Sequence, residues 1–285
     1  MMRMKRATPK DRDAILKLWG AEFGDGPEFI DPFIEWCGWD QIFLLWDEEG
    51  PCALTAAPVM RVALPGGDTA KVGYVYAHTT LKEHRSKGYG RALLRYVDFC
   101  LQNQGMDGVM LVPAQPSLFE YFRTEFYLPA FYLKEYTVKA EELPCCLYQA
   151  RPVSPAEYGT FRELLLLEQP HAVSPNGMLE QQKGLSCAAG ADLYAVETPS
   201  GTACIAAGKN EDGSVLCLEF LSPAGEENNV LAALHEKLDA PTYTVRAPGD
   251  ADGENRPFGM MKWYNADMAM QWYGTKNGWF GLVLE

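Results

Sequence analysis

A short stretch of the chain, HRSKGYGRALL, gathers basic residues and glycines directly before an apolar, helix-like pattern. The cations are Arg85, Lys87 and Arg91, and the glycines are Gly88 and Gly90. The first amides of a helix have no partner inside it, and the helix dipole adds partial positive charge there. Glycine has no Cβ, so its backbone can approach a ligand closely. This combination predicts a site for a phosphate or pyrophosphate.

The spacing separates this loop from two common phosphate loops. A Walker loop needs GxxxxGK[ST], and a dinucleotide loop needs GxGxxG early in a βαβ unit, and the sequence supplies neither here. The pattern is Arg85-x-x-Gly88-x-Gly90, after a predicted strand. The chain as a whole is acidic, with a formal net charge of −13. Nucleic-acid binding is therefore disfavoured, and the basic loop must serve a local purpose.

The elements that must position this loop follow from the hydrophobic periodicity. A helix is expected after Thr8 and Pro9, which suit its N-cap and first position. The other elements of the first half are a helix over 27–36, strands over 41–46, 52–64 and 71–80, a helix over 88–104, a strand over 108–112, a helix near 117–124 and a strand near 131–138.

The second half repeats this order with little sequence identity. It predicts strands over 192–197, 202–208 and 214–221, a helix over 227–238 and a strand over 242–246. The proline-containing segment EELPCCLYQARPVSP separates the halves, so we expect domains over 1–145 and 150–285. The fold class is α+β: two tandem units, each with a mixed, mostly antiparallel sheet flanked by helices.

The stretch YVYAHTTLKEHRSKGYGRALL resembles the acetyl-coenzyme A motif [R/Q]xxGx[G/A] of the GNAT superfamily of N-acetyltransferases. The order of predicted elements over about residues 3–140 is similar to that acyl-CoA N-acyltransferase fold. The resemblance implies acetyl-coenzyme A as the cofactor, with its pantetheine arm paired to the backbone as an added strand. It assigns the pantetheine to His78, Thr79 and Thr80, and the pyrophosphate to Arg85, Ser86, Lys87, Gly88, Tyr89, Gly90 and Arg91.

A general acid must protonate the departing thiolate, and a tyrosine is competent because its pKa of about 10 lies near the thiol's value of about 8.5. The family often supplies it from a YxxxGF motif. Here, aligning Phe126-Tyr127 with Gly-Phe puts Phe122 at the tyrosine position and Tyr121 beside it. We predict Tyr121 as the acid. A register shifted by one residue, an acid from elsewhere and a water molecule are the alternatives.

The general base is less defined. His78 lies on the strand expected to face coenzyme A and could titrate near neutral pH, or could simply be packed or solvated. Asp25, Glu28 and Asp31 fall where the resemblance places the acceptor, and could attract a cationic amine or serve as helix caps. Phe23, Phe29 and Phe33 could wall an acceptor pocket, although core packing is favoured.

The chain's last residues, GWFGLVLE, form an apolar, strand-like tail. Tandem enzymes of the enhanced-intracellular-survival type bring a C-terminal carboxylate into the active site as the base. The resemblance therefore implies Glu285 as a catalytic residue, with the terminal strand inserted beside the first half's site. Ordinary strand pairing within the second half is the alternative.

The second half lacks the basic loop. Its corresponding stretch, EFLSPAGEENNVLAALHEKL, places Glu226 and Glu227 at the helix start, where carboxylates favour the dipole and would repel a pyrophosphate. We interpret it as a degenerate copy that does not bind coenzyme A.

The sequence thus predicts an N-acetyltransferase that passes acetyl from acetyl-coenzyme A directly to a primary amine in a ternary complex. A non-catalytic acyl-coenzyme A sensor, favoured by Phe122, and an interaction protein are the alternatives. The acceptor is a small-molecule or peptide amine of unspecified identity, and homodimer formation is left open. Eight irregularly spaced cysteines and four histidines do not indicate a metal site, and no apolar run is long enough to span a membrane. With no signal peptide recognised, we expect a cytoplasmic protein.

Overall fold

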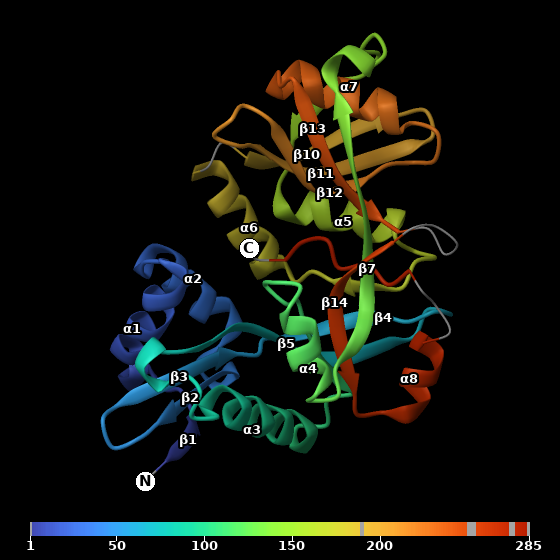
Figure 1. The fold of residues 1–285 in the computed structure, drawn as a ribbon. Helices are drawn as coiled ribbons and strands as arrows, with labels where there is room; N and C mark the ends of the chain where they lie inside the picture. Colours follow the sequence, from blue (N-terminus) through green and yellow to red (C-terminus); the bar gives the residue numbers. More distant parts are fainter. Residues whose placement is uncertain (1, 189–190, 250–254, 274–276, 284–285) are drawn as a thin grey trace. The chain divides into compact units, whose positions relative to one another are not determined.

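The chain divides into two compact units in a computed structural model that describes residues 2–188, 191–249, 255–273 and 277–283 (Figure 1). Unit 1 consists of Met1–Val62, Thr69–Pro129 and Gly259–Gln271, and unit 2 consists of Ala63–Asp68, Ala130–Phe258 and Trp272–Glu285. None of the helices in the described ranges is both long and apolar enough to cross a membrane.

Unit 1 contains most of the elements from the first half of the chain together with two from its end. They are β1 (Arg3–Arg6), α1 (Arg12–Phe23), α2 (Pro27–Cys37), β2 (Ile42–Trp46), β3 (Pro51–Ala56), β4 (Val59–Ala63), β5 (Thr69–Thr80), α3 (Tyr89–Asn103), β6 (Gly108–Leu111), α4 (Leu118–Arg123), β14 (Arg256–Trp263) and α8 (Ala266–Tyr273).

The sheet of unit 1 has the order β1-β2-β3-β5-β6-β14, and its neighbours are antiparallel except for the parallel pair β5 and β6. A parallel pair needs a crossover, and α3 supplies it. Helices α1 and α2 cover one face and α3 the other (Figure 1). The alternation of side chains along β2 turns Phe43 and Leu45 toward Leu94 and Val97 of α3, which forms the buried core of that face.

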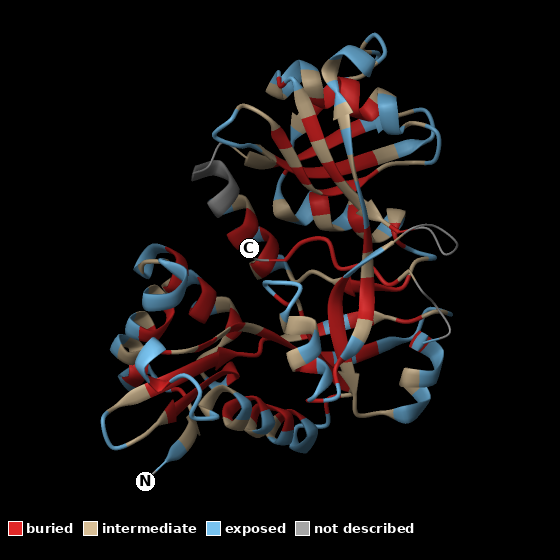
Figure 2. Cartoon of the chain, viewed as in Figure 1, coloured by how far each residue is buried: buried red, intermediate tan, exposed pale blue. Residues whose placement is uncertain are grey.

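Unit 2 repeats this plan. Its elements are β7 (Leu128–Lys139), β8 (Ala150–Pro152), α5 (Pro155–Leu165), β9 (His171–Val173), α6 (Asn176–Ala188), β10 (Ala191–Thr198), β11 (Gly201–Lys209), β12 (Val215–Leu221), α7 (Glu227–Leu238) and β13 (Thr242–Pro248). The sheet order is β7-β13-β12-β11-β10-β8, and β12 and β13 form the parallel pair, which α7 connects. Buried residues gather on the strands, and exposed residues on the outer helix faces (Figure 2).

The mixed, mostly antiparallel fold class is confirmed, and most predicted elements lie within a few residues of their predicted ranges. The strand predicted over 52–64 is instead two strands, β3 and β4, because Pro58 between them lacks a backbone donor. Helix α5 was not predicted, although Ser154 begins it with a capping box: its hydroxyl accepts from the Glu157 amide, and the Glu157 carboxylate accepts from Ser154.

The compact units do not follow the predicted boundary between 145 and 150. Strand β7, expected to close the first half, pairs with β13 from Leu133 to Lys139 and so belongs to unit 2. Strand β14, from the second half, pairs with β6 in unit 1. Each unit therefore takes its last sheet neighbour from the other half of the chain. The chain passes from one unit to the other after residues 62, 68, 129, 258 and 271, and not near residue 150.

Candidate cofactor and active site

Strand β5 separates from β6 halfway along its length. The parallel pairing runs from Val72 to Val75, whereas β5 continues to Thr80. Its pairing with β3 shifts register between Tyr76 and Thr79, and Ala77 has a φ of +48°, which together mark a β-bulge. In the described part of the chain, residues 76–80 have no strand partner on the β6 side. This open edge, which we call the β5 fork, is a place where an extended ligand can add as a strand.

His78 follows the bulge and is held by a buried threonine. Its Nδ1 lies 2.6 Å from the Thr55 hydroxyl oxygen. Burial lowers the pKa of His78 to about 4, so the ring is neutral at neutral pH. A neutral imidazole can accept or donate a hydrogen bond in the fork, but it is a weak proton acceptor for an ammonium group.

The basic loop presents free backbone amides at the start of α3. Ser86 and Gly88 both have positive φ, +63° and +80°, and such alternation turns successive amides toward one point. The first backbone bond at the helix start runs from the Ala92 amide to the Gly88 carbonyl, at 3.0 Å. Among the described residues, the amides of 86–91 donate to no other backbone group. The loop therefore has the geometry of an anion cradle.

The two glycines of the loop have different roles. At Gly88 a side chain would meet no atom within 4 Å, so the positive φ is what favours glycine there. At Gly90 an added Cβ would lie 3.1 Å from the Thr80 hydroxyl oxygen and 3.4 Å from His78 Nε2. Gly90 thus lets the start of α3 pack directly against the β5 fork, in addition to the ligand approach predicted for it.

The loop's side chains are fixed by partners in unit 1. Arg85 pairs with Glu22, and its Nε donates to the Thr80 carbonyl at 3.0 Å. Arg91 pairs at 2.8 Å with Glu125, which is buried. These carboxylates hold the two guanidinium groups in place, so the free amides are the principal unused donors of the loop.

Tyr121 lies against Arg91. The Arg91 guanidinium is 5.6 Å from the centre of the Tyr121 ring. Burial raises the pKa of Tyr121, and the nearby Arg91 opposes that rise. Phe126 has a φ of +68°, a conformation that favours glycine, and Tyr127 after it is fully buried. These conformations are those expected for the Gly-Phe pair of YxxxGF, so the alignment that puts buried Phe122 at the tyrosine position is geometrically reasonable.

Two of the three acidic residues near the predicted acceptor region have structural partners. Asp31 accepts two hydrogen bonds from Arg12, at 2.9 and 2.6 Å. Asp25 accepts from the Trp19 indole at 2.8 Å, while Glu28 is exposed.

Phe29 and Phe33 are buried around Trp19, and Phe23 lies partly exposed beside it. Two of the three phenylalanines considered as pocket walls therefore belong to the core.

Unit 2 contains a second fork at the equivalent strands. The parallel pairing of β12 with β13 covers Val215 to Cys217, and a bulge follows because Ala206 and Ala207 of β11 face Glu219 and Cys217. Leu218 is the extra residue. His78 in β5 and Glu219 in β12 thus come directly after a bulge in corresponding strands.

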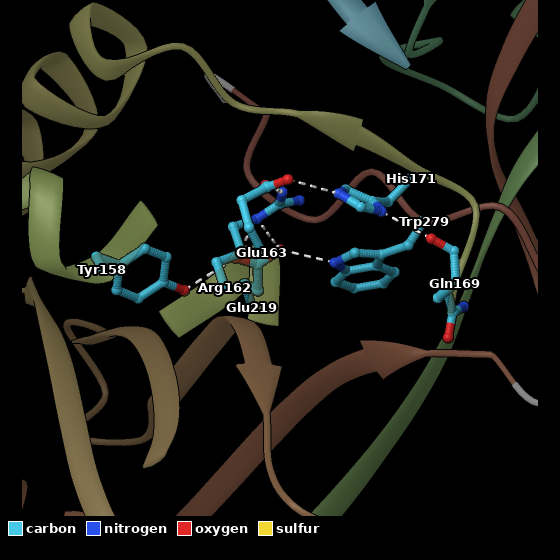
Figure 3. Close-up of polar contacts among 7 residues, drawn as sticks. All are labelled: Tyr158, Arg162, Glu163, Gln169, His171, Glu219 and Trp279. Atoms are coloured by element: carbon cyan, nitrogen blue, oxygen red, sulfur yellow. Dashed lines mark hydrogen bonds and ion pairs between the residues drawn. The ribbon is translucent and has the colours of Figure 1, made fainter. Parts of the chain in front are cut away.

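The second fork is closed by a buried polar cluster (Figure 3). Glu219 accepts from the Tyr158 hydroxyl at 2.9 Å, from Arg162 Nε at 3.0 Å and from the Trp279 indole at 2.7 Å. All four side chains are fully buried. Arg162 also pairs with Glu163, which bonds His171 at 3.0 Å. The chain's own groups use the Glu219 carboxylate completely.

The helix start of unit 2 is also closed. Gly225 has a φ of +84°, close to that of Gly88, but its amide donates to the Glu227 carboxylate at 3.2 Å. Glu226 accepts from the Tyr148 hydroxyl and from Asn229. The negative charges predicted at this helix start are therefore present and already bonded to the chain.

Glu285 lies outside the described residues. The segment before it is bound within unit 2: the Tyr132 amide donates to the Gly278 carbonyl, the Trp279 amide to Pro170 and the Ala172 amide to the Trp279 carbonyl, each at 2.8 Å. The role predicted for Glu285 stays a prediction.

Residues 3–125 match the family model described as "Acetyltransferase (GNAT) domain". A search of curated proteins found no match.

Among solved structures, a conserved protein from Enterococcus faecalis V583 described as a probable N-acyltransferase aligns with a TM-score of 0.76 and 14% identity, covering 95% of this chain and 75% of that one. GCN5-related N-acetyltransferases from Kribbella flavida (TM-score 0.72, 16% identity, 94% of this chain and 72% of that one) and Anabaena variabilis ATCC 29413 (0.73, 12%, 95% and 75%) align similarly. At these identities the similarity shows the fold, and it extends over both units.

Proposed function

We propose that this chain is an acyltransferase of the GNAT superfamily, since residues 3–125 match the acetyltransferase (GNAT) domain model, and that it transfers acetyl from acetyl-coenzyme A to a primary amine by direct attack in a ternary complex. The observation that carries this proposal is the β5 fork beside a loop of free amides. An extended arm fits the edge at residues 76–80, and a pyrophosphate fits the amides of residues 86–91.

The reaction needs an oxyanion donor, a general acid and a general base from the protein. A backbone amide next to the bulge at Ala77 donates to the thioester carbonyl and stabilises the charge that develops on its oxygen. The neutral amine attacks the carbonyl carbon, the carbon–sulfur bond breaks, and Tyr121 gives its proton to the departing thiolate. Arg91 beside Tyr121 stabilises the phenolate left behind.

The amine loses one proton in this sequence, and a base must accept it. We propose that a carboxylate of Glu285 does so, because neutral His78 with a pKa of about 4 is a poor match for an ammonium group. Unit 2, whose fork and helix start are filled by its own side chains, is proposed as a degenerate copy that holds no coenzyme A.

A coenzyme A release assay tests the proposal. Acetyl-, propionyl- and succinyl-coenzyme A are each offered with a panel of polyamines, aminoglycosides, amino acids and peptides. Amine-dependent release that is fastest with the acetyl donor supports it, and mass spectrometry of the product identifies the acetylated nitrogen. Tight coenzyme A binding with no amine-dependent release would instead support a sensor, the alternative favoured by the absence of a hydroxyl at Phe122.

A further inference from the structure

Three potential metal ligands converge in unit 1, directly before the anion loop. The Asp47 carboxylate, the Cys52 thiol and the His84 imidazole each offer one atom, and these atoms lie within 4.8 Å of one another. Cys52 is fully buried, and the side chains of His84 and Asp47 are only 6% and 14% exposed. Three different ligand types in a protected position are unlike an ordinary solvated cluster of acids.

The backbone fixes each of the three positions. Asp47 and Gly50 form the turn between β2 and β3, where the Asp47 amide donates to the Gly50 carbonyl at 3.0 Å. The Asp47 Oδ1 atom accepts from the Glu49 amide at 2.8 Å, which leaves Oδ2 directed at the other ligands. Cys52 lies in β3, and its carbonyl accepts from the Leu81 amide at 3.0 Å.

His84 ends a short 3-10 helix, Lys82–His84, immediately before Arg85. Its ring stacks on that of Tyr89, with centroids 6.0 Å apart. The cluster therefore joins the β2–β3 turn to the start of the anion loop.

The contacts of the His84 nitrogen and the Asp47 oxygen are longer than direct hydrogen bonding favours, while the Cys52 thiol donates to the Gly50 carbonyl at 3.2 Å. His84 Nδ1 lies 3.3 Å from Asp47 Oδ2, the Tyr89 hydroxyl lies 3.3 Å from the same oxygen, and Lys87 Nζ lies 3.4 Å from His84 Nδ1. N–H···O bonds cluster at about 2.7–3.2 Å. Two ligands of a tetrahedral Zn²⁺, each about 2.0–2.1 Å from the metal, stand about 3.3–3.4 Å apart. The 3.3 Å between His84 Nδ1 and Asp47 Oδ2 matches this ligand-to-ligand distance.

We propose that Asp47 Oδ2, Cys52 Sγ and His84 Nδ1 form a site for a zinc-type divalent cation, with one coordination position left for water or another ligand. Carboxylate, thiolate and imidazole are the ligand types of Zn²⁺ sites, and the two anionic ligands balance its charge. Cation binding replaces the thiol proton of Cys52, and that proton is released to solvent.

The cation would bind beside His84 Nδ1, next to the present position of the Lys87 ammonium group. Lys87 is exposed and its long side chain can withdraw from His84 Nδ1. Because Lys87 belongs to the loop that the proposed function assigns to the pyrophosphate, metal binding moves its ammonium group toward the ligand side.

Cobalt(II) is the direct probe for this site. The protein, treated with a chelator to remove metal and kept reduced, is titrated with CoCl₂. One equivalent per chain, with a thiolate-to-cobalt charge-transfer band and the intense visible bands of tetrahedral cobalt, is the expected result. Isothermal titration with ZnCl₂ in two buffers of different ionisation enthalpy then counts the released proton.

The variants locate the ligands. Cys52→Ala is expected to remove the charge-transfer band and to weaken Zn²⁺ binding on the order of 100-fold or more. Asp47→Asn, which preserves shape, weakens it as well. Cys100→Ala is the matched control, since Cys100 is a partly buried free thiol of α3 in the same unit. Circular dichroism and urea midpoints verify that each variant is folded.

Three results would overturn the proposal. One is a thiolate-to-cobalt band that survives in Cys52→Ala. Another is loss of that band in a Cys145→Ala/Cys146→Ala variant, which would place the metal at Cys145 and Cys146. Absence of stoichiometric cobalt binding in the unmodified protein also overturns it. These readouts do not depend on acetyl transfer, so the metal site and the proposed function can fail separately.

Discussion

The forks of the two units have the same arrangement of strands and helix, but different side chains lie at the open strand edge. In both, a parallel strand pair ends at a bulge, and a glycine with positive φ precedes the crossover helix. Past the bulge of β5 stands His78, neutral and bonded to Thr55, whereas past the bulge of β12 stands Glu219, bonded to three buried side chains. The same fold can thus leave an edge open for a ligand or fill it with its own core.

The two forks are expected to affect different properties of the protein, stability in unit 2 and ligand binding in unit 1. In unit 2 the polar groups at the fork stabilise the unit, because the Tyr158 hydroxyl, Arg162 Nε and the Trp279 indole all donate to the buried Glu219 carboxylate. In unit 1 the corresponding amides are left without backbone partners, and a ligand would satisfy them. Substitutions at equivalent positions should therefore change different measurable properties.

The largest effect is expected for Glu219→Gln. The change keeps the shape but removes the charge that faces buried Arg162, and breaking such a pair costs about 3–5 kcal/mol. Urea unfolding monitored by circular dichroism measures it, while coenzyme A affinity should be unchanged. Glu197→Gln is the control, because its exposed pair with Arg151 should contribute under about 1 kcal/mol. A loss of coenzyme A affinity in Glu219→Gln without unfolding would contradict the division between the units.

Gly88→Glu should weaken coenzyme A binding by about 3 kcal/mol, or on the order of 100-fold, because it sets a carboxylate against the pyrophosphate. Gly225→Glu is its matched control: both glycines have positive φ and open space, so the backbone strain is similar. Calorimetric titration compares them. Equal affinity in the two variants would show that the loop of residues 85–91 is not the cofactor site.

Tyr121→Phe tests the chemistry of the first fork separately from its binding. Loss of the acid should lower kcat by about 100-fold while the dissociation constant of coenzyme A stays the same. Tyr96→Phe, at another partly buried tyrosine of unit 1, is the control. Partial recovery of kcat on adding Phe122→Tyr to the Tyr121→Phe variant would show that either position can deliver the proton. An unchanged kcat in Tyr121→Phe would point to water or another residue as the acid.

The sequence predicts the local parts of this comparison well. Short patterns of residue type carry the loop from Arg85 to Arg91, the carboxylates at Glu226 and Glu227 and the order of most helices and strands. The elements β1, β8, α5, β9, α6, β14 and α8 were not predicted. The exchange of β7 and β14 between the units was missed, because strand pairing between distant segments leaves no local periodicity.

The features missed in the candidate sites are also nonlocal. The bulge at Ala77 could not be predicted from the sequence, because an alanine and not a glycine adopts the positive φ there. Glu219 reads as one acidic residue in a strand, and its partners Arg162 and Trp279 come from remote segments. The sequence spacing of Asp47, Cys52 and His84 matches no metal-binding motif. Only the packing of the β2–β3 turn against residue 84 brings their side chains together.

The smallest effect is expected at the helix start of unit 2. Glu227→Lys removes the acceptor of the Gly225 amide and puts a cation at the positive end of α7, which should cost about 1 kcal/mol in unfolding free energy. Glu236→Lys, at the other end of the same helix, makes the same charge change where a cation is favourable, so it should be neutral or slightly stabilising. Calorimetry should still count one coenzyme A per chain in Glu227→Lys, because the carboxylate of Glu219 and the indole of Trp279 keep the second fork filled. A second equivalent would mean that charge alone, and not the filled fork, separates the two units.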